Sequence, residues 1–280
     1  MERRNCCRGR AISIKLEPAV QAERLYSNRI EDHEATMAHS KIHRRIQKEI
    51  TEHLSCSPVF RELLVLDPPD IESLIRLCSD RGRDVEVRQG CAVVLGALRA
   101  RRAVGVLVQN MWEGQPSLVA SSANAVMQIR SKSATVPLLR VLSECPLPES
   151  REAAAMVFKY VRDERAILAL QRTLANKNEG REVRFQAADA LAAWEPERSL
   201  DAFLQASFDQ EPEVRWIASY GLAACAGDRA VAALKRLVND NEAPPGMESV
   251  GTHASELLEA LARRESDSKQ GISTEGNNLE

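Results

Sequence analysis

The sequence predicts an all-α fold, an α-solenoid in which two-helix repeats stack into a superhelix. Two observations predict it. A unit recurs with a spacing of 31 to 33 residues, and such a period indicates stacked supersecondary units. Apolar residues make up 44% of the chain but aromatic residues only 4%, and this excess of small aliphatic residues favours closely packed helices over a β-sandwich.

The first helix of each unit is marked by a column of arginines near its start. The column contains Arg88, Arg151, Arg184 and Arg215, and a divergent copy has Val119 there. Small or apolar residues recur four, seven and ten positions after this column, as at Ala92, Leu95 and Leu98. This spacing is that of one helical face.

A second amphipathic helix follows each first helix after a short polar break. These helices are expected to begin at Ala103, Ala134, Ala166, Ser199 and Ala230. The residue four positions further on is apolar in every copy. Each unit is therefore predicted to be helix, turn, helix, with the arginine-bearing helix first. One such pair cannot bury both apolar faces alone, so the units must stack.

The chain outside the repeats divides into three further parts. Residues 1–39 show no periodic pattern and are expected to form a disordered leader. Residues 40–66 carry isoleucines at intervals of four and predict N-terminal capping helices. Residues 67–264 hold about five full or near-full repeats and a C-terminal cap, and the polar residues 265–280 predict a disordered tail.

Charge and cysteine content narrow the classes of function. Because 38 basic residues nearly balance 40 acidic ones, a whole-protein electrostatic grip on nucleic acid or on an anionic membrane is disfavoured. Seven cysteines without a C-x-x-C pair are typical of a reducing compartment. No segment approaches the ~18 apolar residues of a membrane span, and the first ten residues lack the apolar core of a signal peptide. We expect a cytoplasmic protein.

The repeat residues resemble a known family of helical repeats. The resemblance covers residues 67–264 and rests on Val87-Arg88, Leu95-Gly96, Asp163-Glu164-Arg165-Ala166, Val183-Arg184, Val214-Arg215 and Asp228-Arg229-Ala230. These segments resemble the short bacterial HEAT repeats called PBS lyase HEAT-like repeats. The resemblance implies HEAT-like helix pairs, in proteins that include bilin lyase subunits as well as scaffolds and regulators. A related hydroxylase binds metal in its repeats, but these units contain no histidine before His253, so no metal site is implied.

The column arginines Arg88, Arg151, Arg184 and Arg215 are expected to have a structural, inter-repeat role. They lie on the packed face of their helix, so the stem should be buried. The guanidinium group should then pair with an acid or a turn carbonyl of a neighbouring repeat. A phosphate-binding ladder is the alternative.

A row of polar residues on the second helices is the candidate partner-binding surface. The row consists of Gln109, Arg140, Arg172, Gln205 and Arg236. These positions lie opposite the buried stripe and should face solvent. If the second helices line the concave face, the row suits an acidic segment of a protein partner. A merely solvated face would show the same residues.

Two aromatic residues, Phe185 and Trp216, follow the column arginine in consecutive repeats. They are expected to stack across the repeat boundary, or to act as aromatic anchors for a partner. His39 and His43 lie four apart but make only half of a metal site. The sequence therefore predicts no catalytic residue, no metal site and no cofactor.

The function predicted from these observations is a non-enzymatic scaffold or adaptor that binds a protein partner along its concave face. The alternative is a subunit of a bilin lyase-like enzyme, in which the groove would hold a tetrapyrrole. Nucleic-acid binding is disfavoured by the near-neutral charge, and no membrane partner is expected.

Overall fold

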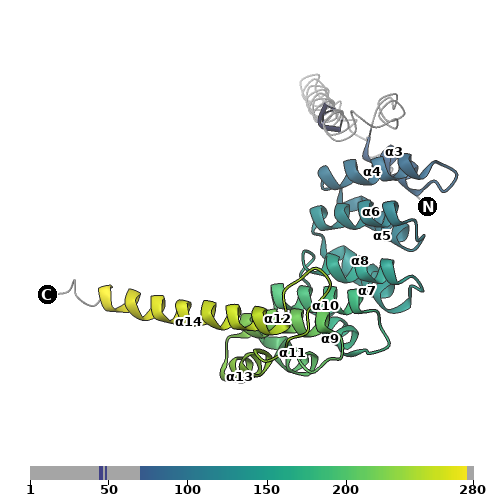
Figure 1. Cartoon of the computed structure of the whole chain (residues 1–280). Helices are drawn as coiled ribbons and strands as arrows, with labels where there is room; N and C mark the ends of the chain where they lie inside the picture. The colour runs from purple at the N-terminus through teal and green to yellow at the C-terminus, as the bar shows by residue number, and fades with distance from the viewer. Residues whose placement is uncertain (1–43, 47, 49–69, 276–280) are drawn as a thin grey trace, which may run out of the picture. The chain divides into compact units, whose positions relative to one another are not determined.

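The computed structural model describes residues 44–46, 48 and 70–275, and every regular element between residues 70 and 275 is helical (Figure 1). The expected leader, residues 1–39, lies outside the described residues, as does most of the expected N-terminal cap, residues 40–66. The stacked helices all belong to one compact unit, Ile46–Glu280. The structure confirms the predicted all-α fold of stacked helix pairs.

Short and long helices alternate along the described chain. The shorter helices are α3 (Ile71–Ser79), α5 (Val104–Met111), α7 (Thr135–Glu144), α9 (Ile167–Ala175), α11 (Leu200–Ala206) and α13 (Asp228–Leu237). The longer helices are α4 (Val85–Ala97), α6 (Pro116–Ile129), α8 (Pro148–Phe158), α10 (Arg181–Trp194), α12 (Pro212–Cys225) and α14 (Val250–Glu275). Single 3-10 turns, at residues 101–103, 132–134, 164–166 and 197–199, lead into α5, α7, α9 and α11.

Local chemistry fixes where several helices begin. Pro116, Pro148 and Pro212 occupy the first turn of α6, α8 and α12, where the missing N–H and the fixed φ of proline are favourable. The Asp70 side chain accepts a hydrogen bond from the Ser73 N–H and so caps α3. Asp163 caps the 3-10 turn before α9 in the same way.

The structure pairs the helices differently from the sequence prediction. Of the two short helices beside it, each long helix from α4 to α12 packs more extensively on the one that precedes it, as α4 does on α3 and α6 on α5. The predicted unit, which begins with the arginine-bearing helix, is therefore shifted by one helix. The 3-10 turns connect neighbouring pairs, whereas the loops before the long helices lie within a pair.

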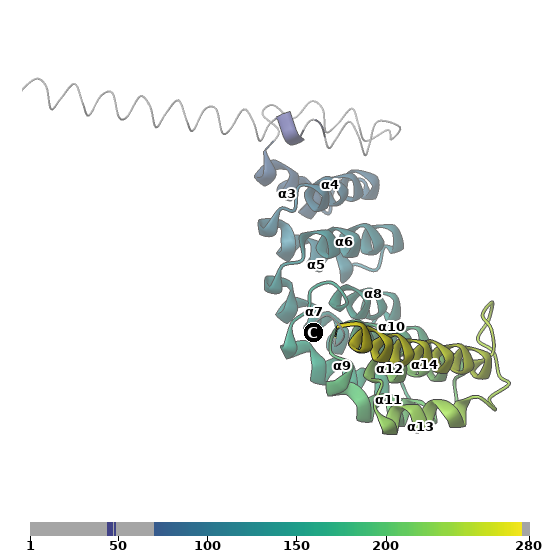
Figure 2. The same ribbon diagram turned by 90° about the vertical axis from the view of Figure 1, so that its left-hand side faces the viewer.

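The long helices form one layer of the stack and the short helices form the other (Figure 2). Neighbouring long helices pack closely: a Cβ built on Gly96 of α4 would lie 2.7 Å from the Ala125 Cα of α6. Neighbouring short helices touch over fewer residues. In a curved two-layer stack the closely spaced layer lies inside the curve. Figure 2 shows this arrangement, with α10, α12 and α14 inside the bend and α9, α11 and α13 outside it.

The last helix, α14, packs on α12 and α13 and so covers the end of the stack. It continues to Glu275 and overlaps residues 265–280, for which the sequence predicts a disordered tail. Along this part Ser266 donates a side-chain hydrogen bond to the Ala262 carbonyl, and Arg263 pairs with Glu259 one turn earlier.

Candidate functional site

Arg88 shows what the column arginines do. Its side chain is almost fully buried on α4. Its Nε–H donates to the Cys78 carbonyl at 3.1 Å, its Nη1 donates to a Glu113 carboxylate oxygen at 2.6 Å, and its Nη2 donates to the Asn110 side-chain oxygen at 2.7 Å. The Arg88 guanidinium group thus links the end of α3 to the loop before α6. The hydrogen bond from Arg88 lowers the pKa of Glu113.

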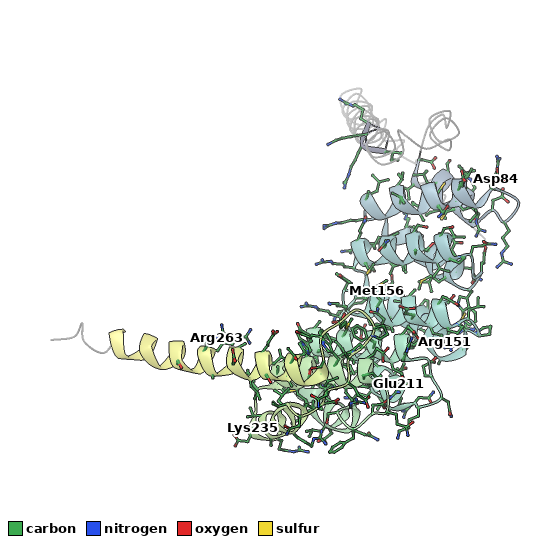
Figure 3. All side chains as sticks on the ribbon, viewed as in Figure 1. Asp84, Arg151, Met156, Glu211, Lys235 and Arg263 are labelled. Atoms are coloured by element: carbon green, nitrogen blue, oxygen red, sulfur yellow. The ribbon has the colours of Figure 1, made fainter. Side chains whose placement is uncertain are left out.

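The other three arginines repeat this arrangement. Each donates to a backbone carbonyl at the end of the preceding short helix or in the loop after it, and to a carboxylate in the loop before the next long helix. The carboxylates are Glu179 for Arg151, Asp209 for Arg184 and Asp240 for Arg215 (Figure 3, where Arg151 is labelled). These guanidinium groups already hydrogen-bond to protein carbonyls and carboxylates and are largely buried, which disfavours the alternative of a phosphate-binding ladder. In the divergent copy Val119 is buried, and so is Cys145 in the loop that follows α7.

The five residues of the predicted partner-binding row are all exposed and lie on the short helices α5, α7, α9, α11 and α13. These helices form the outer layer, so the expectation that the row lines the concave face is wrong (Figure 2). The physical reason is the packing described above, in which the long helices approach one another most closely. Two members also have partners: Arg140 pairs with Glu144 at 3.5 Å, and Arg236 covers the Phe208 ring at 3.3 Å.

Phe185 and Trp216 lie on the inner layer and stack across the repeat boundary. Their ring centroids are 6.4 Å apart with an interplanar angle of 21°. The stack continues to His253 of α14, whose ring lies 3.7 Å from that of Trp216 at 5°. Trp216 is therefore sandwiched between two rings, while Phe185 forms the open end of the stack.

Phe185 lines a pocket of about 240 Å³ at the N-terminal halves of the long helices. Pro244, Pro245 and Met247 form an apolar wall, and Met247 is 44% exposed. Glu152, Glu182 and Glu213 line its rim together with Arg181, which pairs with Glu182 and with Glu213 at 3.0 Å in each case. Burial, followed by the nearby Glu182 charge, raises the pKa of Glu152. The pocket therefore combines a partly exposed apolar wall with a rim of three carboxylates and one arginine.

A second pocket of about 490 Å³ lies where α4 and α6 end, beside the residues that follow α8. It is lined by Arg99, Asn124, Gln128, Arg130 and Tyr160. Arg130 lies over the Tyr160 ring at 5.8 Å. The sequence prediction missed this group. The available signal was a column eleven residues after the arginine column, which contains Arg99, Arg130 and Arg162.

Among the described residues, histidine, cysteine and carboxylate side chains are the candidate metal ligands, and the cysteine thiols are candidate nucleophiles. Within residues 70–264 no group of three or more histidine, cysteine, aspartate or glutamate side chains could hold a metal ion. His39 and His43 lie outside the described residues. Burial raises the pKa of the Cys78 and Cys225 thiols to about 11, so neither is a ready nucleophile. No described helix is both long enough and apolar enough to span a bilayer.

The stacked helix pairs, and the buried arginines that link neighbouring pairs by hydrogen bonds, define an α-solenoid built from repeated units. Residues 178–250 match the family model described as HEAT repeats. No curated protein sequence matches the chain significantly.

Several solved structures are similar to this chain at low identity. A designed armadillo repeat protein is 16% identical with a TM-score of 0.44, over 69% of this chain and 100% of that one. The complex of CpcE and CpcF of phycocyanin lyase from Nostoc sp. is 18% identical with a TM-score of 0.39, over 68% and 82%. Human deoxyhypusine hydroxylase is 16% identical with a TM-score of 0.31, over 82% and 97%.

Proposed function

We propose that this protein is a non-enzymatic scaffold or adaptor that binds a protein partner along the inner, concave face of its helix stack. HEAT repeats generally bind proteins, and stacked repeats present an extended concave surface for this purpose. The long helices form this face, so its specificity residues are those that the long helices expose and not the row on the short helices.

The observation that carries the proposal is the Phe185 pocket. Phe185 is partly exposed and held in place by Trp216, so it loses little conformational freedom when a partner binds. The apolar wall formed by Pro244, Pro245 and Met247 can enclose an apolar side chain against it. Partly exposed aromatic residues in such pockets are typical of interface hot spots. Phe185 is the proposed anchor, and Trp216 supports it from behind.

The experiment is an affinity capture from the native host, followed by mass spectrometry and by titration of the recovered partner. We expect a stoichiometric protein partner for the wild type and a loss of about 2 kcal/mol of binding free energy in Phe185→Ala. Phe185→Leu keeps apolar contact and should lose less. Leu168→Ala removes a 56% exposed leucine from α9, on the outer layer, and should bind like the wild type.

Three outcomes would overturn the proposal. One is equal binding by Phe185→Ala and Leu168→Ala, with both variants folded by circular dichroism. Another is loss of the partner when Arg140, Arg172 and Arg236 of the outer row are changed to glutamate. The third is a coloured eluate with bilin absorbance, which would favour the lyase alternative that follows from the PBS lyase-type repeats.

The proposal includes a reducing cellular compartment. Cys78, Cys145 and Cys225 form no disulfide, which is the usual state of cysteines in cytoplasmic proteins. We place the protein in the cytoplasm, with no cofactor and with a protein as its main partner.

A further inference from the structure

Three arginines occupy equivalent positions just after consecutive long helices. Arg99 follows α4, Arg130 follows α6 and Arg162 follows α8. All three side chains are exposed. Arg99 and Arg130 line one pocket, and Arg162 is the equivalent residue of the next repeat. Together they form a basic edge on the inner layer, one arginine per repeat.

No acidic side chain in the described part of the chain neutralises the charges of this basic edge. Among the described residues, none of the three arginines forms an ion pair, and the pocket contains no carboxylate. The arginines before the short helices differ. Arg102, Arg198 and Arg229 bind Glu72, Glu164 and Asp201, respectively. These three exposed arginines therefore have acidic partners, whereas those of the basic edge, like the exposed Arg101 and Arg172, have none among the described residues.

The backbone at two of these positions favours a different residue. Arg99 and Arg130 both have φ of 52°, in the left-handed region where glycine usually ends a helix. A positive charge near the C-terminal end of a helix is stabilising. An arginine in the last turn of the helix would give the same benefit without adopting the left-handed backbone conformation. Arginine thus occupies these positions at a cost in backbone free energy, as alanine does at Ala226, and lies beside the polar side chains of Asn124, Gln128 and Tyr160.

We propose that the basic edge binds an acidic segment of the protein partner in an extended conformation. The inference rests on the proposed function and deepens it by naming the chemistry of the bound segment. Arg99 and Arg130 each present a planar donor fork to a carboxylate, while the Asn124 and Gln128 amides reach the peptide backbone. Neighbouring helices lie about 10 Å apart and an extended chain advances about 3.3 Å per residue. Acidic residues at about every third position therefore match the arginine spacing.

The charge distribution favours a protein segment over nucleic acid. The chain carries a net charge of −2, and the same inner layer presents carboxylates of Glu152, Glu182 and Glu213 at the Phe185 pocket. Arg181 pairs with two of these carboxylates, and the negative charge that remains disfavours a continuous phosphodiester backbone there. A peptide can place acidic side chains at the basic edge and apolar ones at Phe185.

The test is fluorescence anisotropy with the full chain and a labelled Gly-Ser peptide that carries glutamate at every third position. We expect salt-sensitive binding, and about tenfold weaker binding by the double variant Arg99→Gly/Arg130→Gly. Glycine relieves the left-handed backbone, so this variant should remain folded. Arg140→Gln/Arg172→Gln removes the same charge from the outer row, Ala226→Gly makes the same backbone change at a third residue with φ of 52°, and both should bind normally.

The outcomes separate this inference from the proposed function. No peptide binding, equal binding by the double variant and the outer-row variant, or binding of an oligothymidylate in preference to the peptide would each overturn the inference. If partner capture still depends on Phe185 in any of these cases, the scaffold proposal stands without the acidic segment. If capture is also independent of Phe185, both fail.

Discussion

Arg184 and Asp209 form a buried bidentate pair that joins two neighbouring repeats. Arg184 Nη1 lies 3.1 Å from Asp209 Oδ1, and Nη2 contacts Oδ2. The same guanidinium donates through Nε to the Leu174 carbonyl at 2.9 Å. One side chain of α10 therefore holds the end of α9 and the loop before α12 in place.

Loss of this arginine should strongly destabilise the stack. Arg184→Ala leaves the Asp209 carboxylate buried without its cation, and breaking such a pair costs about 3–5 kcal/mol. Urea unfolding followed by circular dichroism measures the change. Arg229→Ala removes an exposed pair with Asp201 and should cost less than about 1 kcal/mol. Equal effects of the two substitutions would contradict the structural role of the column.

Two glycines give a matched test of helix spacing in the inner layer. A Cβ on Gly96 would meet the Ala125 backbone at 2.7 Å, so Gly96→Ala must separate α4 from α6. We expect a loss of about 1–3 kcal/mol of unfolding free energy. Gly105 of α5 has nothing within 4 Å of its Cβ position, so Gly105→Ala should add about 0.5–1 kcal/mol. Thermal melts of the two proteins check the opposite signs, and a stable Gly96→Ala protein would contradict the close packing.

The two arginine columns and the aromatic stack show what the sequence can predict and what it cannot. The column containing Arg184 is visible in the sequence because a buried arginine recurs at the same position of successive units. The Phe185–Trp216 contact is predictable because the two residues occupy equivalent positions in adjacent repeats. The pairing of the helices cannot be predicted from the sequence, because the repeat period is the same whether a helix packs on the preceding or on the following helix. Arg99 and Arg130 were missed because their importance depends on which layer is concave, and that is a property of packing.

The thiols of buried Cys78 and half-buried Cys225 should be unreactive in the folded protein. Burial raises the pKa of Cys78 and Cys225 to about 11, whereas an exposed cysteine titrates near about 8.5. At about pH 8 the thiolate fraction of Cys78 and Cys225 is then roughly two hundredfold lower than that of an exposed cysteine. Iodoacetamide labelling with peptide mass mapping should show these two residues modified only after unfolding. Rapid labelling of either in the native protein would contradict their burial.

His253 should make stability depend on pH in the mildly acidic range, near and below the ordinary histidine pKa of about 6.5. Its Nδ1 lies 2.8 Å from the Ser219 hydroxyl, which itself donates to the Trp216 carbonyl at 2.7 Å. Nδ1–H is therefore the donor to Ser219. Burial lowers the pKa of His253, and the nearby Glu256 charge opposes this only partly.

The sign of the effect follows from proton binding. Below the ordinary histidine pKa of about 6.5 the unfolded chain binds a proton that the folded chain does not, so stability falls as the pH is lowered. His253→Phe keeps the ring on Trp216 and removes the titration. Unfolding midpoints measured from about pH 7.5 to about pH 5.5 should fall more steeply for the wild type than for this variant. The other histidines are common to both proteins, so any difference between the two pH profiles comes from position 253. Parallel profiles would contradict the prediction that His253 makes stability depend on pH.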